Sequence, residues 1–529
     1  MYKILIKEKI SDVAISYLNE RANVVLGYDF DRKKFLEELK DAHALIVRSG
    51  TRVTEDILST AKNLKVVGRA GTGVDNIDIE AATKRGIIVV NTPDSNTISA
   101  AEHTLALIFA LLRNIPQAYL SMKEGKWDRK KFQGKELTGK TLGVIGLGRI
   151  GYEVSVRAKG LKMEVIAYDP YIPDKRFESA GIKRAKDLKE LLSSSDIVTI
   201  HVPKTKNRPE VIGEEEFQYI KEGVYLINCA RGGLINEELL YKYLKSGKVK
   251  GAALDVFSKE PPDRSDLFDL PNVIYTPHLG ASTSEAQYRA GLSIAKSVLD
   301  ILNGKFAPHI VNIPHPGENI EEIKDFIRLA EVMGELFVQI SRMPVDEITI
   351  EYMGDFVEEN TSIIGRFFLK EFLRPIVQDI VNYVNSPLIA KRRGINVKEV
   401  KNPASKNYKN LIKIVGTSGN THNTLAGTVL EGGDLRIVMI DDYPIDLTPS
   451  SNMLVVTNMD KPGMIGKVGT ILGKHHINIA GLRLGRIIKG DMAKIVLNLD
   501  DEVPRDVILE ITEQEGIVDA IFVKLKNTL

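Results

Sequence analysis

The stretch that decides the fold is TLGVIGLGRIG, residues 141–151. Its first half is apolar and predicts a buried strand, and glycines at positions 146, 148 and 151 follow where that strand should meet a helix. Glycines at this spacing allow a tight turn and let the backbone approach a pyrophosphate, which then lies against unpaired N–H groups of the helix N-terminus. The stretch therefore predicts a dinucleotide-binding α/β fold, and a glycine-rich turn without a ligand is the alternative.

The next apolar run indicates which dinucleotide would bind. Asp169 ends the run EVIAYD, where a carboxylate would accept hydrogen bonds from a ribose diol. The same charge would repel a 2′-phosphate, so we expect NAD as the cofactor and no metal. Lys175 and Arg176 lie further along the chain and are interpreted as a solvated pair.

Short apolar runs alternate with helical patterns on both sides of the glycine turn. Residues 2–97 contain the runs YKILI, ALIVR, LKVVGRAG and GIIVVNTP, and residues 98–282 contain TLGVIG, EVIAYD, DIVTIHVP, VYLINCA, GAALDVF and VIYTPH. This βαβ rhythm is typical of parallel sheets. Two successive series predict two doubly wound lobes with a cleft between them.

The rest of the chain predicts two further domains. A helix from about residue 282 ends before Gly304, and the three prolines of KFAPHIVNIPHPGEN favour a linker. After another helix, β-rich runs and glycine turns predict a mixed α+β domain over residues 315–450. Residues 451–529 follow the pattern strand, helix, strand, strand, helix, strand.

The composition excludes several classes of function. With 72 basic and 70 acidic residues the formal net charge is +2, which provides no general attraction for nucleic acid or an anionic membrane. The longest apolar stretch, TLALIFALL, has about half the length of a membrane span, and MYKILIKEKI lacks the apolar core of a signal peptide. Cys229 is the sole cysteine, which suits a reducing compartment. We expect a soluble, cytoplasmic protein.

The stretch NCARGGLIN, residues 228–236, places Arg231 at the end of a predicted buried strand. A guanidinium has five donors and no acceptor, so Arg231 requires an anion or carbonyl oxygens. It can clamp a carboxylate through two parallel hydrogen bonds and polarise an adjacent carbonyl group. Cys229 could be a catalytic thiol, but no histidine lies nearby in sequence, and a buried filler is the preferred interpretation.

Among the nine histidines, His278 has the most informative context, because it follows a strand and opens a helix in TPHLGAST. Glu260 lies in DVFSKEPP, on a loop fixed by two prolines, and a carboxylate beside an imidazole favours proton exchange near neutral pH. The alternatives are a helix-capping histidine and a solvated acid. His201 could line the cofactor cleft. Core or surface roles are expected for His103 and, without an acidic partner, for His43, His309, His315, His422, His475 and His476.

These side chains all follow strands of one lobe, and open α/β sheets bind ligands at the carboxyl ends of their strands. A dinucleotide, a cation, an acid and a base therefore converge on one cleft. Hydride transfer between nicotinamide and C2 of a 2-hydroxy or 2-keto acid uses all four. Arg231 would orient the acid, His278 would move the proton of the C2 oxygen, and Glu260 would tune His278.

GLGRIG with Asp169, NCARGG, DVFSKEPP and TPHLGAST together resemble the D-isomer-specific 2-hydroxyacid dehydrogenase family over about the first 310 residues. The resemblance implies interleaved lobes: residues 1–97 and 283–310 form a flavodoxin-like substrate domain, and residues 98–282 form a Rossmann-type NAD-binding domain inserted into it. It also implies the residues of the cofactor site, which are Thr72, Gly146, Gly148, Arg149, Ile150, Gly151, Asp169, Val202, Cys229, Ala230, Arg231, Asp255, His278, Leu279, Gly280 and Ala281.

VGRAGTGVDNID and NTPDSNTISAAEHT resemble the long members of this family, which oxidise 3-phosphoglycerate in L-serine synthesis. That substrate carries a phosphate and needs a second basic site. The residues expected to supply it are Arg48, Ser49, Thr51, Arg69 and Gly71. Arg129, Lys130 and Lys131 could help across a subunit interface, although solvated charges are the simpler interpretation. The alternatives are a dehydrogenase for an unphosphorylated acid such as glyoxylate, and an NAD-sensing, corepressor-like binding protein.

MDKPGMIGKVGTIL followed by HHINIAGL resembles an ACT domain, a small-molecule sensor that works as a dimer. The resemblance implies L-serine as the effector, bound by Asn458, Asp460 and Asn478, in a homodimer or homotetramer. An ACT fold that serves only assembly is the alternative. Residues 315–450 resemble the intervening domain of the same long members, where Lys391, Arg392 and Arg393 could bind an anion or form a plain basic helix end.

Overall fold

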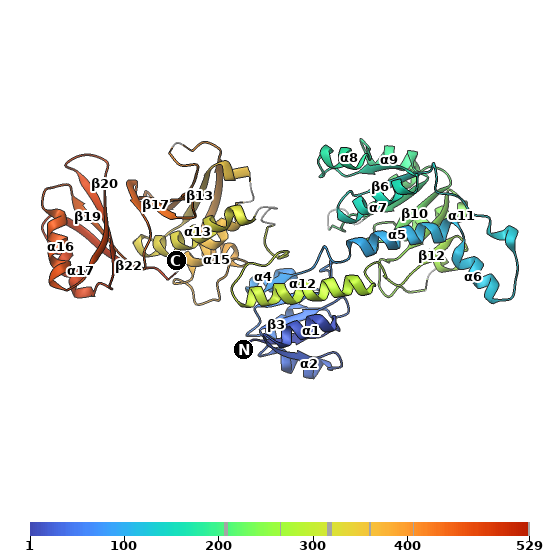
Figure 1. Cartoon of the computed structure of the whole chain (residues 1–529), viewed down its shortest axis with the longest axis horizontal. Coiled ribbons are helices and arrows are strands. Elements are labelled where there is room, and N and C mark those ends of the chain that lie inside the picture. Colours follow the sequence, from blue (N-terminus) through green and yellow to red (C-terminus); the bar gives the residue numbers. More distant parts are fainter. Residues whose placement is uncertain (206–209, 265, 315–319, 359–360, 406, 527–529) are drawn as a thin grey trace.

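The structure, a computed structural model, describes residues 1–529 with the exception of 206–209, 265, 315–319, 359–360, 406 and 527–529. The described residues form four sheets that follow one another along the chain. Figure 1 shows an elongated molecule, with the C-terminal sheet at one end and the lobe that carries the glycine turn at the other.

The N-terminal lobe is built on a five-stranded parallel sheet in the order β2-β1-β3-β4-β5. Its elements are β1 (Lys3–Ile6), α1 (Asp12–Asn19), β2 (Asn23–Leu26), α2 (Arg32–Leu39), β3 (Ala44–Val47), α3 (Glu55–Thr60), β4 (Val66–Arg69), α4 (Ile79–Lys84) and β5 (Ile88–Val90). The central strand β3 is buried along its whole length, because helices cover both faces of the sheet. The partly exposed strand β2 lies at an edge and was missing from the predicted apolar runs.

A helix from much later in the chain completes this lobe. α12 (Ser284–Leu302) packs against β4 and α1. A Cβ atom at Gly68 would lie 2.8 Å from Cγ2 of Val298, so glycine in β4 lets this helix approach the sheet closely. Beyond α12, Ile310 pairs with Val90, and Asn312 donates to the carbonyl oxygen of Ile87. Ile310 and Asn312, within the predicted linker segment, therefore pack on the N-terminal lobe, and residues 315–319, including His315, lie outside the described residues.

The second lobe is a seven-stranded parallel sheet in the order β12-β11-β10-β9-β6-β7-β8. Its elements are α5 (Thr97–Leu112), β6 (Thr141–Ile145), α7 (Arg149–Gly160), β7 (Glu164–Tyr168), α8 (Asp174–Ala180), β8 (Lys183–Arg184), α9 (Leu188–Ser194), β9 (Ile197–Ile200), α10 (Glu214–Tyr219), β10 (Val224–Asn228), α11 (Glu237–Ser246), β11 (Val249–Leu254) and β12 (Val273–Tyr275). The strand order reverses between β6 and β9, beside the glycine turn, which is where such sheets bind ligands. The prediction of two doubly wound parallel sheets is confirmed.

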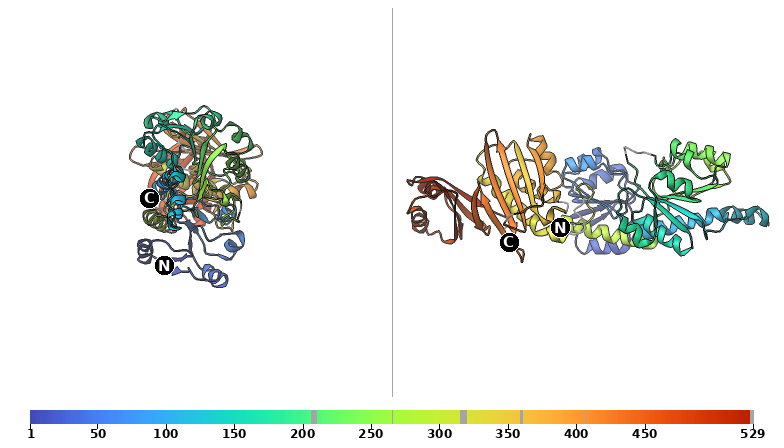
Figure 2. Two further views of the ribbon diagram at one scale, coloured as in Figure 1. Left: turned by 90° about the vertical axis from the view of Figure 1, so that its right-hand side faces the viewer. Right: turned by 90° about the horizontal axis from the view of Figure 1, so that it is seen from above.

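An arm projects from the second lobe after α5 (Figures 1 and 2). The chain breaks at Asn114, which has a left-handed backbone, and continues as α6 (Ile115–Lys123) and the short helix η1 (Arg129–Phe132). Among the described residues, no single helix has the length and apolar character needed to cross a membrane. The helices α5 and α6 satisfy those criteria only as a pair, and the pair is bent by 62°.

The third domain is a six-stranded sheet in the order β14-β13-β15-β16-β17-β18, in which the β13–β14 pair is parallel and the other pairs are antiparallel. Its elements are α13 (Ile320–Ile340), β13 (Glu347–Gly354), η3 (Asp355–Glu358), α14 (Ser362–Leu373), α15 (Ser386–Arg392), β14 (Asn396–Asn402), β15 (Asn410–Ser418), β16 (Thr421–Val429), β17 (Leu435–Ile440) and β18 (Tyr443–Leu447). Residues along β13 alternate between buried and partly exposed, as expected for a sheet with one face covered by helices. The predicted mixed α+β domain is confirmed.

The C-terminal domain has the predicted βαββαβ order, with an antiparallel sheet arranged β20-β21-β19-β22. Its elements are β19 (Asn452–Met459), α16 (Met464–Lys474), β20 (Ile479–Arg486), β21 (Met492–Leu499), α17 (Arg505–Thr512) and β22 (Ile517–Lys524). A partly buried ion pair joins it to the third domain, with Nζ of Lys494 2.6 Å from Oδ2 of Asp441.

Candidate active site

A cleft of about 1090 Å³ lies between the N-terminal lobe and the second lobe. Most of the residues that the sequence predicts to bind the substrate or to act in catalysis line this cleft. The N-terminal lobe contributes Arg48, Ser49, Arg69, Gly71 and Thr72, and the second lobe contributes Arg231, Glu260, His278 and Ala281. The structure therefore brings a basic wall and a possible proton relay together in one cleft.

Arg231 leaves the carboxyl end of β10 on a turn held by Asn228. The Asn228 side chain donates to the carbonyl oxygen of Arg231 and accepts from the backbone N–H of Ala230. A Cβ atom at Gly232 would lie 1.7 Å from the carbonyl oxygen of Phe257, so glycine is required there. Nη1 of Arg231 donates to the carbonyl oxygen of Ala230 at 2.8 Å. Arg231 also lines the cleft.

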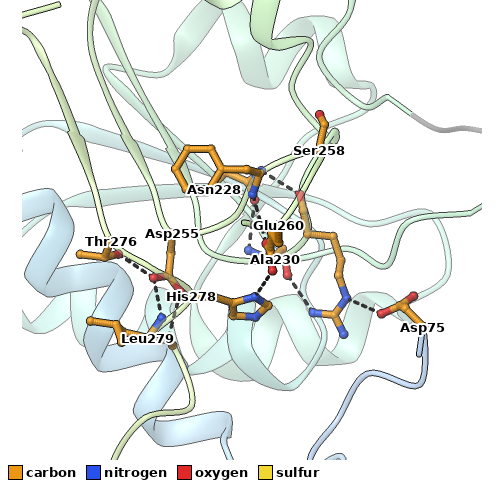
Figure 3. Close-up of polar contacts among 12 residues, drawn as sticks. Asp75, Asn228, Ala230, Asp255, Ser258, Glu260, Thr276, His278 and Leu279 are labelled. Carbon is orange, nitrogen blue, oxygen red and sulfur yellow. Dashed lines mark hydrogen bonds and ion pairs between the residues drawn. The ribbon is translucent and has the colours of Figure 1, made fainter. Parts of the chain in front are cut away.

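His278 and Glu260 form the closest acid–imidazole pair of this site (Figure 3). Nδ1 of His278 lies 2.7 Å from Oε2 of Glu260, and the second oxygen of Glu260 accepts from the backbone N–H of Phe257. When Nδ1 carries the proton that is donated to Glu260, Nε2 is free to accept one. The pair can therefore act as a general base that becomes a general acid in the reverse reaction.

The turn that carries His278 is organised by the fully buried carboxylate of Asp255. Asp255 accepts hydrogen bonds from the hydroxyl of Thr276 (2.6 Å) and from the backbone N–H groups of Leu279 (2.7 Å) and Gly280 (2.9 Å). His278 has a left-handed backbone and donates its N–H to the carbonyl oxygen of Asp255. Burial works to raise the pKa of Asp255, but these hydrogen bonds and one from His103 outweigh it and lower the pKa.

His103 was not expected to support the site. Its Nε2 lies 3.2 Å from Oδ1 of Asp255, so a helix of the second lobe reaches the turn behind His278. The two residues are 152 positions apart, and no local pattern of sequence indicated the contact.

The glycine turn fits a dinucleotide. Gly146 has φ +92°, and a Cβ atom there would lie 2.6 Å from Cγ1 of Val202. A Cβ at Gly151 would lie 2.0 Å from the carbonyl oxygen of Gly146, whereas one at Gly148, the N-cap of α7, would meet nothing within 4 Å. Asp169 accepts from the backbone N–H of Leu147 at 2.9 Å, which ties the turn to the end of β7. This leaves an open approach to the N-terminus of α7, the feature that a pyrophosphate needs.

Arg149, at the glycine turn, already has a partner in this structure. Its Nε lies 2.6 Å from Oδ1 of Asp94, and Oδ2 of Asp94 lies 3.1 Å from Nε2 of His309.

Enclosure by the protein lowers the pKa of His201, at the end of β9, to about 4. His201 is therefore neutral at physiological pH.

Arg48 and Arg69 form a basic wall opposite His278. Burial lowers the pKa of Arg69 to about 10, and the charges of Arg231 and Arg48 add to this effect. All three guanidinium groups line the same cleft. Thr51, also predicted to bind substrate, does not line the cleft; its backbone N–H donates to Glu8 instead.

Several other predicted residues lie apart from this cleft. Arg129, Lys130 and Lys131 are on η1 and are exposed. In the C-terminal domain, Oδ2 of Asp460 accepts from Gly490 and Arg486, and the buried Asn458 donates to the carbonyl oxygen of Met459. Asn478 binds Asp500 at the other end of the sheet, so one chain does not bring Asn478 to Asp460.

Cys229 is buried, and this burial, with the charge of Asp255, raises the pKa of its thiol to about 12 in spite of a hydrogen bond from Thr104. The thiol is therefore inert at neutral pH, as the buried-filler interpretation requires. The expectation that the remaining loop histidines lack acidic partners is wrong in three cases, because the chain brings distant acids to them. These pairs are His309–Asp94 (3.1 Å), His422–Asp442 (3.2 Å) and His475–Glu510 (2.8 Å).

Comparison with known proteins covers nearly the whole chain. Residues 105–280 match the family described as D-isomer specific 2-hydroxyacid dehydrogenase, NAD binding domain, residues 322–441 match the D-3-phosphoglycerate dehydrogenase intervening domain, and residues 452–516 match the ACT domain. A D-3-phosphoglycerate dehydrogenase of Methanocaldococcus jannaschii is 45% identical over 526 residues, which is 99% of this chain and 100% of the relative. The protein of the same name from Bacillus subtilis is 40% identical over 528 residues, again covering 99% of this chain and 100% of the relative.

Solved structures match more than half of the chain. A glyoxylate reductase from Paecilomyes thermophila is 29% identical with a TM-score of 0.54, and covers 59% of this chain and 98% of its own. A D-lactate dehydrogenase from Aquifex aeolicus, complexed with NAD and lactic acid, is 30% identical with a TM-score of 0.51, and covers 57% of this chain and 96% of its own. The full-length relatives and the order of the three matched regions decide the assignment: this chain belongs to the D-3-phosphoglycerate dehydrogenase family, in the long form that ends in an ACT domain.

Proposed function

We propose that this chain oxidises D-3-phosphoglycerate to 3-phosphohydroxypyruvate with NAD, the first step of L-serine biosynthesis. The observation that carries the proposal is one cleft in which Arg231, His278 and Glu260 face the arginines Arg48 and Arg69. The names of the full-length relatives support the same activity. They favour an enzyme over a nucleotide-sensing binding protein.

The residues of the second lobe account for the chemistry at C2. Arg231 clamps the substrate carboxylate and holds C2 in one orientation. Nε2 of His278 removes the proton from the C2 hydroxyl group, and Glu260 stabilises the imidazolium that forms. The chemistry that bound NAD supplies is acceptance of the hydride from C2. Gly146, Gly148 and Gly151 would hold its pyrophosphate, and Asp169 would hold the adenosine ribose.

The basic wall accounts for the phosphate. A phosphate ester carries a charge of about −1.5 to −2 at pH 7 and three acceptor oxygens, so it satisfies paired arginines better than a hydroxyl group does. Arg48 and Arg69 line the cleft opposite the catalytic pair. An unphosphorylated acid such as glyoxylate would leave this wall without an anion.

An amino-acid effector, L-serine, binds at the ACT domain, and this site requires a second copy of the chain. Asp460 and Asn478 lie at opposite ends of the sheet within one chain, with β20 as an edge strand between them. A two-fold axis beside β20 would bring Asn478 of one copy toward Asp460 of the other.

The arm supplies a second contact between copies, because it exposes a group of large apolar side chains, namely Ile115, Tyr119, Leu120, Met122 and Trp127.

A steady-state assay with NAD tests the proposal by comparing D-3-phosphoglycerate with D-glycerate, each with and without L-serine. D-3-Phosphoglycerate is expected to have the higher kcat/KM, and L-serine is expected to lower turnover. A preference for D-glycerate would overturn the substrate assignment, and turnover indifferent to L-serine would overturn the effector assignment. Light scattering of the same sample checks for a homodimer or homotetramer.

A further inference from the structure

The rim of the cleft beside Arg48 is built around a half-buried carboxylate of the protein itself, that of Glu8. Glu8 follows β1, and the loop of residues 48–51 follows the neighbouring parallel strand β3. Oε1 of Glu8 accepts from the backbone N–H groups of Arg48 and Thr51, both at 2.9 Å, and Oε2 accepts from that of Gly50 at 3.0 Å. Neighbouring backbone N–H groups that converge on one point in this way form an anion-binding concavity. Here the protein fills it with its own carboxylate.

The carbonyl groups of the same loop are held from the other side. Nδ2 of Asn76 donates to the carbonyl oxygens of Arg48 at 2.8 Å and of Thr51 at 2.6 Å. The loop is therefore fixed through both its donors and its acceptors, and the backbone from which the Arg48 and Ser49 side chains project has one defined position. The amides of Arg48, Gly50 and Thr51 are occupied by Glu8 and are not available to a ligand in the cleft.

Glu8 influences the cleft without facing it. Its neighbour Lys9 and the loop residues Arg48 and Ser49 line the cleft, whereas Glu8 lies behind the loop. Burial works to raise the pKa of Glu8, but the hydrogen bonds from the loop outweigh it and lower the pKa, so the carboxylate stays ionised. Its negative charge also opposes the repulsion that Arg69 experiences from Arg48 and Arg231.

We propose that Glu8 is a positioning residue that sets specificity for the phosphorylated substrate, by fixing the loop that carries Arg48 and by balancing the charge of the arginine cluster. The inference rests on the proposed function, since it names the group that aligns the phosphate-binding wall. Glu8 acts through Arg48 and touches neither substrate nor cofactor.

The test is a comparison of Glu8→Gln with the wild type on D-3-phosphoglycerate and D-glycerate, which differ only in the phosphate. The amide keeps the size of the side chain but turns one acceptor into a donor that faces backbone N–H groups. Loss of one charged hydrogen bond is expected to raise the KM for D-3-phosphoglycerate about tenfold, with kcat little changed. The kinetic parameters for D-glycerate and the KM for NAD are expected to stay as in the wild type.

Three further variants separate positioning from general damage. Asp31→Asn is the matched control, because Asp31 is a carboxylate of the same lobe that accepts one backbone N–H, from Lys34 at 2.8 Å, away from the cleft. It should leave both substrates unaffected. Glu8→Asp keeps the charge and should give a KM between those of the wild type and Glu8→Gln. In an Arg48→Ala background, Glu8→Gln should have little further effect, because the two residues act on one contact.

The outcomes are distinguishable. A wild-type enzyme that does not prefer D-3-phosphoglycerate refutes the proposed function before any variant is compared. With that preference established, equal losses on both substrates, or an unchanged KM in Glu8→Gln, would refute the role of Glu8. If Glu8→Gln does not fold, Glu8→Asp carries the same comparison, and an unchanged substrate preference there refutes the inference.

Discussion

Arg231 of the second lobe and Asp75 of the N-terminal lobe form an ion pair across the cleft, with Nε of Arg231 3.4 Å from Oδ2 of Asp75. The side chain of Asp75 is 80% exposed, so solvent screens the pair, which contributes at most about 1 kcal/mol. A substrate carboxylate that binds Arg231 with two hydrogen bonds competes easily with such a partner. Asp75 thus holds the guanidinium toward the cleft without blocking the substrate.

The geometry of Arg231 predicts that lysine cannot replace it. Arg231→Lys keeps the charge but loses the planar pair of donors, and kcat/KM for D-3-phosphoglycerate is expected to fall about 100-fold. Asp75→Asn, which removes only the screened partner, should change kcat/KM by less than about fivefold. Titration of NADH fluorescence should give the same cofactor affinity in Asp75→Asn and in the wild type. Full activity in Arg231→Lys would mean that Arg231 does not clamp the carboxylate.

The 2.7 Å contact between His278 and Glu260 predicts a large loss in Glu260→Gln. A glutamine amide can donate to Nδ1 as well as accept from it, so it no longer enforces one tautomer, and it cannot stabilise the imidazolium. We expect kcat to fall about 100-fold or more, with little change in the KM for NAD.

Glu237→Gln is the matched control for this loss. Glu237 accepts hydrogen bonds from Ser258, on the same loop as Glu260, but does not contact His278. Its kcat should stay close to that of the wild type. If kcat falls equally in the two variants, the loss comes from a disturbed loop and not from the contact between Glu260 and the His278 imidazole.

Asp255 predicts a pH-dependent contribution to stability. Its pKa is lower in the folded protein than the unfolded value of about 3.9, so its contribution is fully present above that value and is lost as the pH falls through the folded pKa. Asp255→Asn is expected to reduce the free energy of unfolding of the second lobe by about 1–3 kcal/mol at pH 7. Urea unfolding at pH 7 and at pH 3 should show this difference shrink in acid. A difference that is the same at both pH values would mean that the charge of Asp255 contributes nothing.

The parts of this protein that the sequence predicts well are those that depend on nearby residues. The strands of the two parallel sheets are continuous apolar runs because both faces are buried, and such runs are visible without a structure. β2 and β8 were missed because they are short edge strands with exposed residues. The glycine turn at Gly146 and Gly151 could be predicted from the sequence because a side chain at either position would clash with its surroundings.

The supporting residues could not be predicted, because they act through contacts between distant parts of the chain. His103 meets Asp255 across 152 residues, and Glu8 meets the loop of Arg48 across 40. A pattern of sequence gives the order of the elements along the C-terminal domain but not the direction of each strand in the sheet. Because β19 and β20 both run antiparallel to β21, Asp460 after β19 and Asn478 before β20 lie at opposite ends of the sheet. The motifs therefore predicted residues that line the cleft, whereas tertiary packing decides which residues support them.

The thiol of Cys229 provides a test of the second lobe that needs no substrate. With a pKa of about 12, roughly one thiol in 10,000 is ionised at pH 8, and the group is also buried. Iodoacetamide at pH 8 is therefore expected to leave the native protein unlabelled, and to label it once per chain after denaturation in urea, as counted by mass spectrometry. Cys229→Ala should retain most of its kcat, because the thiol takes no part in the proton relay of His278 and Glu260. Rapid labelling of the native protein with loss of activity would instead place a reactive thiol in the cleft, and would contradict both the burial and the mechanism.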